Sequence, residues 1–247
     1  MRKRIKYSFI GVMALGLVSV ASFARAYPAI GAAIWPSFYG MEQAGPRVVV
    51  DKAMPVSMRA DLLRDAETAT STVRNFYGAF HRQPYLVACS TEACDRELGG
   101  RGAMGDTYLT PFATVIRLSP RGANKTILTH EFSHVELHAR LGLWTQITRA
   151  FPAWFDEGVA VVVSDDSRYL NPGATASGRC ARSSEEPLPA SGSGWGAKSG
   201  QDPMIYTDAA CRVLQWMDAH GGKAGLLQAL DATGKGVAFM PENGRRG

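Results

Sequence analysis

The spacing of apolar residues along the chain predicts several helices and a few short strands. Apolar residues that recur every three or four positions indicate helices over 57–80, 125–141, 206–219 and near 223–231, and a further helix that begins at about Pro152. Short runs of β-branched and other apolar residues predict strands at 48–50, 85–88 and 113–118. Helices and strands in this proportion predict an α+β fold, in which a small mixed sheet is followed by a mainly helical part over roughly 143–235.

Polar residues and glycines at the ends of these segments predict where the helices begin and end. Ser57 is placed as the N-cap of the helix over 57–80, and Asn124 or Thr126 as the cap of the helix over 125–141. Gly142 is expected to stop that second helix. Residues 99–102, with three glycines, predict a loop, because no phosphate-binding frame of strand and helix surrounds them.

A long segment over 171–204 breaks the helical pattern. Proline, glycine and serine dominate it, with Glu185, Glu186 and Trp195 embedded. A stretch of this length without periodicity is either a functional lid or a disordered excursion. Both readings remain open from the sequence.

Residues 1–26 have the composition of a secretory signal peptide. A basic start is followed by an apolar stretch from Phe9 to Phe23 and by an A-x-A cleavage pattern at 24–26. The apolar stretch is shorter than the roughly 20 residues that a spanning helix needs, so cleavage is favoured over an uncleaved anchor. The expected location is therefore outside the cytoplasm, in the periplasm or the medium.

Removal of this leader changes the charge of the chain. The leader holds five of the 27 basic residues and none of the 22 acidic ones, so residues 27–247 are formally neutral. A neutral chain gives no electrostatic reason to expect nucleic acid as a partner or stable membrane insertion. The remaining length fits a single domain, expected to be a monomer.

Four cysteines in an exported chain suggest two disulfides. Three pairings are open, and the favoured one joins Cys89 to Cys94 in a tight loop and Cys180 to Cys211 across the irregular segment. A cysteine metal site is disfavoured because the chain has no C-x-x-C pair.

The strongest chemical signal is the pentapeptide His130-Glu131-Phe132-Ser133-His134, an H-E-x-x-H motif. Two histidines four residues apart on a helix lie one turn apart, about 6 Å along the axis, so both rings can bind one ion. Glu131 projects about 100° round the helix from His130 and is placed to act on a water molecule rather than to bind the metal. The motif predicts a zinc site in which Glu131 is the general base.

A third ligand is expected from the second helix, in the sequence W-F-D-E-G-V-A at 154–160. Glu157 lies 23 residues after His134, which is enough for a loop and a returning helix. Asp156 is an alternative ligand, or a group that orients a ligand. His138 continues the histidine series, but three successive turns of one straight helix cannot converge on a tetrahedral ion. It is interpreted either as a residue at the rim of the site or behind its ligands, or as a histidine on the helix surface.

With these two motifs the chain resembles the gluzincin metallopeptidases, the group of thermolysin and the aminopeptidase N-like enzymes, over about residues 105–165. The resemblance implies a zincin-like domain over 27–247, a Zn²⁺ ion bound by His130, His134 and Glu157, and hydrolysis of peptide or protein substrates with Glu131 as base. It also implies that the strand before the zinc helix is a sheet edge beside the cleft, and an ordinary structural strand is the alternative.

The resemblance further implies a tyrosine that stabilises the oxyanion, and Tyr206 is the candidate because it begins the helix after that of Glu157. His138 and Tyr169 are weaker candidates for this role, and the alternative for Tyr206 is an aromatic packing residue at a helix start. Two other readings remain: an inactive zinc scaffold that binds peptides, and a metal that only stabilises the fold.

Overall fold

The structure is a computed structural model, and it describes residues 25–110, 113–148, 151–173, 175–182, 184 and 186–241. Most of the predicted leader, Glu185 and the end of the basic tail lie outside these residues. The described chain forms two compact units. The first comprises the chain up to Ala60 with Tyr85–Tyr108 and Val115–Ala123, and the second contains the rest.

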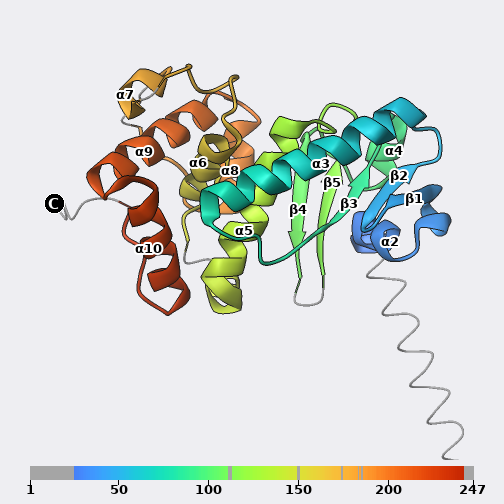
Figure 1. Cartoon of the computed structure of the whole chain (residues 1–247), viewed down its shortest axis with the longest axis horizontal. Coiled ribbons are helices and arrows are strands. Elements are labelled where there is room, and N and C mark those ends of the chain that lie inside the picture. The colour runs from blue at the N-terminus through green and yellow to red at the C-terminus, as the bar shows by residue number, and fades with distance from the viewer. Residues whose placement is uncertain are drawn as a thin grey trace, which may run out of the picture. The chain divides into compact units, whose positions relative to one another are not determined.

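The first unit is built around a five-stranded mixed sheet with the strand order β1-β2-β3-β5-β4 (Figure 1). Strand β1 (Met41–Gly45) pairs antiparallel with β2 (Val48–Asp51), and β2, β3 (Tyr85–Ala88) and β5 (Thr114–Leu118) are parallel. β4 (Gly105–Leu109) is the neighbour of β5 at the edge. The α+β prediction is confirmed, as are the strands at 48–50, 85–88 and 113–118.

The expectation that the strand before the histidine helix is a sheet edge is wrong. β5 lies between β3 and β4, and all five of its residues are buried. The extra strand β4 forms the edge instead, and its sequence GDTYL gives little apolar signal from which to predict it. Arg117, the polar residue within β5, is fully buried and pairs with Asp95 and Asp106, so its charge is compensated within the unit.

Short helices complete the first unit. They are α2 (Pro28–Ile34), the 3₁₀ helix η1 (Pro36–Tyr39) and α4 (Glu92–Glu97). α2 contacts β2 and β3, and its residues Ile30, Ala32 and Ala33 contribute to a core with Val49, Val87 and Val115. The predicted Cys89–Cys94 disulfide is present. Thr91, which lies between the two cysteines, is the N-cap of α4.

The second unit is helical, apart from chain segments that connect it to the sheet. Its helices are most of α3 (Val56–Tyr77), then α5 (Lys125–Thr148), α6 (Ala153–Ser164), α7 (Ala176–Arg179), α8 (Gly192–Ser199), α9 (Ile205–Ala219) and α10 (Gly222–Gly234). The predicted helices are all present. The position of Ser57 as N-cap is wrong, because α3 already begins at Val56.

Within this unit α6 packs against both α5 and α9, and α10 packs against α5 and α9. α6 therefore lies against two long helices of its own unit, α5 and α9. Of the helices in the described part of the chain, none has the length and apolar character needed to cross a bilayer.

The second predicted disulfide is absent. Cys180 and Cys211 are free thiols, although their side chains are close enough for a hydrogen bond. Cys211 is fully buried on α9. Burial and this neighbouring thiol raise the pKa of Cys180 to about 12.

Candidate metal centre

The histidines of α5 lie on a helical segment with well-defined ends. The side chain of Asn124 accepts a hydrogen bond from the backbone N–H of Ile127, so Asn124 rather than Thr126 is the N-cap. At the other end Gly142 has φ 74° and ψ 171°, which breaks the helix where the sequence predicts its end. Within these limits His130, His134 and His138 lie on successive turns of one face.

The structure brings together the three residues predicted as metal ligands. Nε2 of His130 lies 3.1 Å from Nε2 of His134 and 3.3 Å from Oε2 of Glu157. Nε2 of His134 lies 3.7 Å from the same carboxylate oxygen. The side chains are 11%, 12% and 21% exposed respectively, so the cluster is largely removed from water but not sealed.

These three separations match what a single tetrahedral ion requires. With metal–ligand bonds of about 2.0–2.1 Å, ligand atoms at the corners of a tetrahedron lie about 3.3 Å apart. The observed values of 3.1, 3.3 and 3.7 Å bracket that figure. Two imidazoles and one carboxylate are also a common ligand set of catalytic zinc, which leaves a fourth position for water or substrate.

Asp156 does not join this set. Its Oδ1 lies 2.7 Å from Nδ1 of His134, on the opposite side of that ring from Nε2, and its Oδ2 lies 2.7 Å from Nε2 of His138. The two rival third ligands of the sequence analysis therefore pair with each other beside the cluster. Because Asp156 and Glu157 are about 100° apart on α6, one carboxylate reaches each side of the His134 ring.

The close approach of carboxylates and imidazoles changes their acidity. Burial alone would raise the pKa of Glu157, but hydrogen bonds and charge from His130 and His134 outweigh it and lower the value to about 2. The pKa of Asp156 is lowered in the same way by His134 and His138, against the effect of burial. Burial opposes the charged form of His134, yet Asp156 and Glu157 raise its pKa well above 6.5.

Packing against α9 determines where α6 presents its carboxylates. A Cβ atom at Gly158 would lie 2.6 Å from the carbonyl oxygen of Ala209 and 2.7 Å from Val213, so only glycine permits this approach. The helix that approaches Gly158 is therefore α9. Pro152 is the N-cap of α6, and the next residue, Ala153, donates its backbone N–H to the carbonyl of Ala190.

The predicted catalytic residues lie close to the cluster. Glu131 is buried, with 6% of its surface exposed. The ring centroid of Tyr206, at the start of α9, lies 6.3 Å from that of His130. Burial, followed by the charge of Glu157 and smaller contributions that include Glu131, raises the pKa of Tyr206, so its hydroxyl stays protonated and able to donate.

Two aromatic side chains hold Tyr206 in this position. Tyr169 stacks on it at 5.1 Å, and Trp195, which is 4% exposed, meets it edge-on at 5.0 Å. Trp195 comes from α8, in the segment 171–204, for which the sequence predicts a lid or a disordered excursion. In its described residues this segment carries α7 and α8 and is tied to α9, where Arg182 pairs with Asp208 and Arg212 donates to the carbonyl of Ser184.

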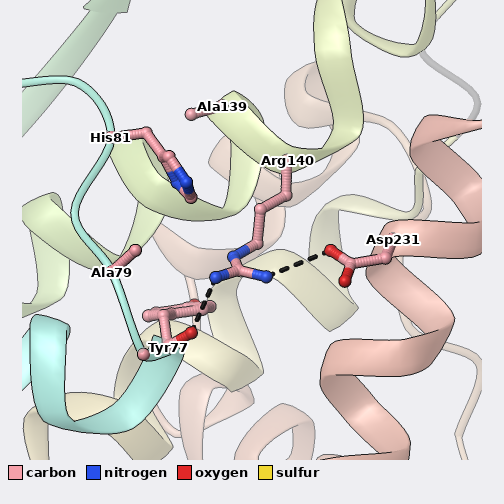
Figure 2. A pocket seen from close by; sticks show the side chains of 7 residues that line it. Tyr77, Ala79, His81, Ala139, Arg140 and Asp231 are labelled. Carbon is pink, nitrogen blue, oxygen red and sulfur yellow. Dashed lines mark hydrogen bonds and ion pairs between the residues drawn. The ribbon is translucent and has the colours of Figure 1, made fainter.

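A second polar cluster lies on the other side of α5 and was missed from the sequence. The fully buried Glu136 accepts hydrogen bonds from the backbone and Nδ1 of His81 and from Arg140, which also reaches Asp231 and the carbonyl of Tyr77. A cavity of about 640 Å³ lies beside Arg140. Figure 2 shows residues that line it, with the hydrogen bonds from Arg140 to Asp231 and to Tyr77. All charged groups there are satisfied by one another, which is the pattern of a structural network that joins α3, α5 and α10.

One further group has metal-binding side chains, Asp51 with Cys89 and Cys94. Both sulfur atoms belong to the disulfide, and Asp51 accepts hydrogen bonds from Ser90, so this group is not available to a metal.

No family model, curated protein or solved structure matches this chain. A function is therefore inferred from the geometry of the cluster on α5 and α6.

Proposed function

We propose that the protein is a zinc-dependent metallopeptidase of zincin-like architecture, with His130, His134 and Glu157 as metal ligands. The observation that supports this most directly is the set of mutual distances of the three ligand atoms, 3.1, 3.3 and 3.7 Å, since they suit a tetrahedral ion without rearrangement. A bound zinc ion would supply Lewis acidity, which polarises a carbonyl group and makes water easier to deprotonate.

The residues of the chain have distinct roles in peptide hydrolysis under this proposal. Glu131 is the general base, which takes a proton from the attacking water and returns it to the leaving amine. Glu131 directly follows His130 and projects about 100° round the helix from it. Its carboxylate therefore lies beside the ligands and does not compete with them for the metal.

Tyr206 is proposed to donate a hydrogen bond to the oxyanion that forms on the scissile carbonyl. Two observations support this role, namely the distance of 6.3 Å between the rings of Tyr206 and His130 and the raised pKa of the hydroxyl. A protonated tyrosine keeps its O–H available as a hydrogen-bond donor at neutral pH.

We propose in addition that the protein acts outside the cytoplasm on peptide or protein substrates. The leader-like composition of residues 1–26 and the Cys89–Cys94 disulfide both suit an oxidising compartment.

The experiment that tests this function is hydrolysis of a broad peptide mixture by the zinc-loaded chain, followed by mass spectrometry. Glu131→Gln should retain zinc but lose most turnover, at least about 100-fold. Glu67→Gln, an exposed glutamate on α3, is the matched control and should behave as the parent. Cleavage should stop when a chelator removes the metal.

Two results would count against the proposal. If Glu131→Gln cleaved peptides as fast as the parent, Glu131 would not be the base. If the parent bound zinc and peptides but cleaved none, the chain would instead be a zinc scaffold for peptide binding.

A further inference from the structure

His138 stands one turn beyond the predicted ligands and makes a contact that the H-E-x-x-H motif does not account for. Its Nε2 lies 2.7 Å from Oδ2 of Asp156, while Oδ1 of the same carboxylate lies 2.7 Å from Nδ1 of His134. One carboxylate therefore bridges two imidazoles on successive turns of α5. The three side chains are 20%, 15% and 12% exposed, so water competes weakly for these hydrogen bonds.

Both hydrogen bonds have a defined direction. Each oxygen of the Asp156 carboxylate lies 2.7 Å from an imidazole nitrogen, and a carboxylate flanked in this way accepts both hydrogen bonds. Nδ1 of His134 and Nε2 of His138 must therefore both carry protons. With its proton on Nδ1, a neutral His134 presents the lone pair of Nε2 on the side where Glu157 and His130 lie.

We propose that His138 is a positioning residue of the metal centre, which acts on the ion through Asp156 and His134. His138 fixes the rotation of the Asp156 carboxylate by holding Oδ2. The other oxygen is then directed at Nδ1 of His134, and the orientation of the His134 ring follows. Without His138, Asp156 could turn about its side-chain torsions and its hydrogen bond to His134 would weaken.

Alternative roles for His138 agree less well with the geometry. As a metal ligand it would need a ring nitrogen close to those of the predicted ligands, but among the described residues the group within 4.8 Å consists of His130, His134 and Glu157. Its Nε2 instead makes a 2.7 Å hydrogen bond to Asp156. As a plain surface histidine it would be more than 20% exposed and would not share a largely buried carboxylate with a predicted ligand.

The inference deepens the proposed function, on whose metal site it rests, but it does not require peptidase activity. Its test is therefore the affinity for Zn²⁺ alone, measured by competition with a chromophoric chelator in a double-mutant cycle. The variants are His138→Leu, Asp156→Ala and the combination of both, with folding checked by circular dichroism.

Removing a group that orients a metal-bound histidine typically costs about 10–100-fold in metal affinity. Asp156→Ala should fall in that range, and His138→Leu should weaken zinc binding about 10-fold. In the Asp156→Ala background His138→Leu should have no further effect, because its route to the metal is already broken. His138→Gln, whose amide can still donate to Asp156, should restore most of the affinity.

A matched control is His81→Leu. His81 also binds a carboxylate on α5, that of Glu136, but away from the metal cluster, so zinc affinity should not change. Co²⁺ in place of zinc gives a second readout, since a reoriented His134 should shift the visible absorption bands of the His138→Leu protein.

The inference is wrong if His138→Leu binds zinc as the parent does, or if its effect is the same with and without Asp156. If the parent binds no zinc, this inference and the proposed function both fail. If zinc binding shows the expected coupling but no peptide is cleaved, only the peptidase proposal fails.

Discussion

Oε2 of Glu157 lies 3.3 Å from Nε2 of His130, although the two residues come from different helices. Three features produce this proximity. Asn124 and Gly142 define the ends of the helix that carries His130, and Gly158 lets the helix that carries Glu157 pack closely on α9. The distance is therefore a consequence of helix packing in the second unit, and predictions follow for the packing as well as for the chemistry.

The loss of the Tyr206 hydroxyl should affect turnover rather than substrate binding. Tyr206→Phe retains the ring stacked on Tyr169, so the helix start and the cluster should keep their geometry. We expect kcat on a cleaved peptide to fall about 100–1,000-fold with KM little changed, as for the loss of an oxyanion donor. Steady-state kinetics check this, with Tyr27→Phe at an exposed position as control. An unchanged kcat would remove Tyr206 from the mechanism.

A methyl group at Gly158 should destabilise the helical unit. In Gly158→Ala the new Cβ would lie 2.6 Å from the backbone oxygen of Ala209, so α6 and α9 must separate. Overpacking of this kind costs about 1–3 kcal/mol. Urea unfolding measures the cost, and Gly196→Ala, on α8 with open space around its Cβ, should cost far less. Equal stability of Gly158→Ala and the parent would contradict the close packing of α6.

The stability of the metal-free protein should fall as the pH rises through neutrality. The raised pKa of His134 contributes stability that is fully present below about pH 6.5 and is lost as the pH passes its folded-state pKa. The lowered pKa values of Asp156 and Glu157 act in the other direction, and their contribution is lost only as the pH falls below about 4. With chelator present, the Tm should therefore be higher near pH 6 than near pH 9.

Two comparisons isolate this effect. Asp156→Asn removes the charge that contributes most to raising the pKa of His134, so its Tm should depend less on pH over the same range. Excess zinc should also flatten the dependence, since the metal takes the place of the proton. A Tm that rises steadily from pH 6 to pH 9 in chelator would contradict the ion pairing of His134.

The cysteines should separate into one disulfide and two unreactive thiols. Burial of Cys211 and the raised pKa of Cys180, about 12, leave little thiolate at neutral pH, so iodoacetamide should modify the folded chain slowly. After unfolding without reductant, mass spectrometry should find two alkylated cysteines, and four after reduction. No alkylation without reductant would mean that Cys180 and Cys211 form a second disulfide.

The sequence predicts the helices because their apolar residues recur every three or four positions, and the buried strands because each is a short run of apolar residues. Strand β1, with sequence MEQAG, and the glycine-rich helix α8 lack such a pattern. β1 forms by pairing with the adjacent β2, and α8 packs against α6 and α9. The position of β5 inside the sheet could not be predicted either, since β4 that covers its edge gives no strand pattern.

The metal cluster likewise contains residues whose positions follow from local helix geometry and others whose positions depend on how the helices pack. The spacing of H-E-x-x-H determines His130 and His134 through helix geometry, and Asn124 and Gly142 act through local backbone hydrogen bonds and torsions. The choice between Asp156 and Glu157 depends on how α6 is rotated against α5, which is set by its packing on α9. The hydrogen bond between His138 and Asp156 depends on that same rotation.

The central claim is that His130, His134 and Glu157 bind one metal ion, and zinc titration of the metal-stripped chain by isothermal calorimetry tests it most directly. We predict one tightly bound Zn²⁺ per chain, and loss of tight binding in Glu157→Ala with the fold retained. Stoichiometric zinc binding that is unchanged in Glu157→Ala, or no binding by the parent chain, would contradict the account.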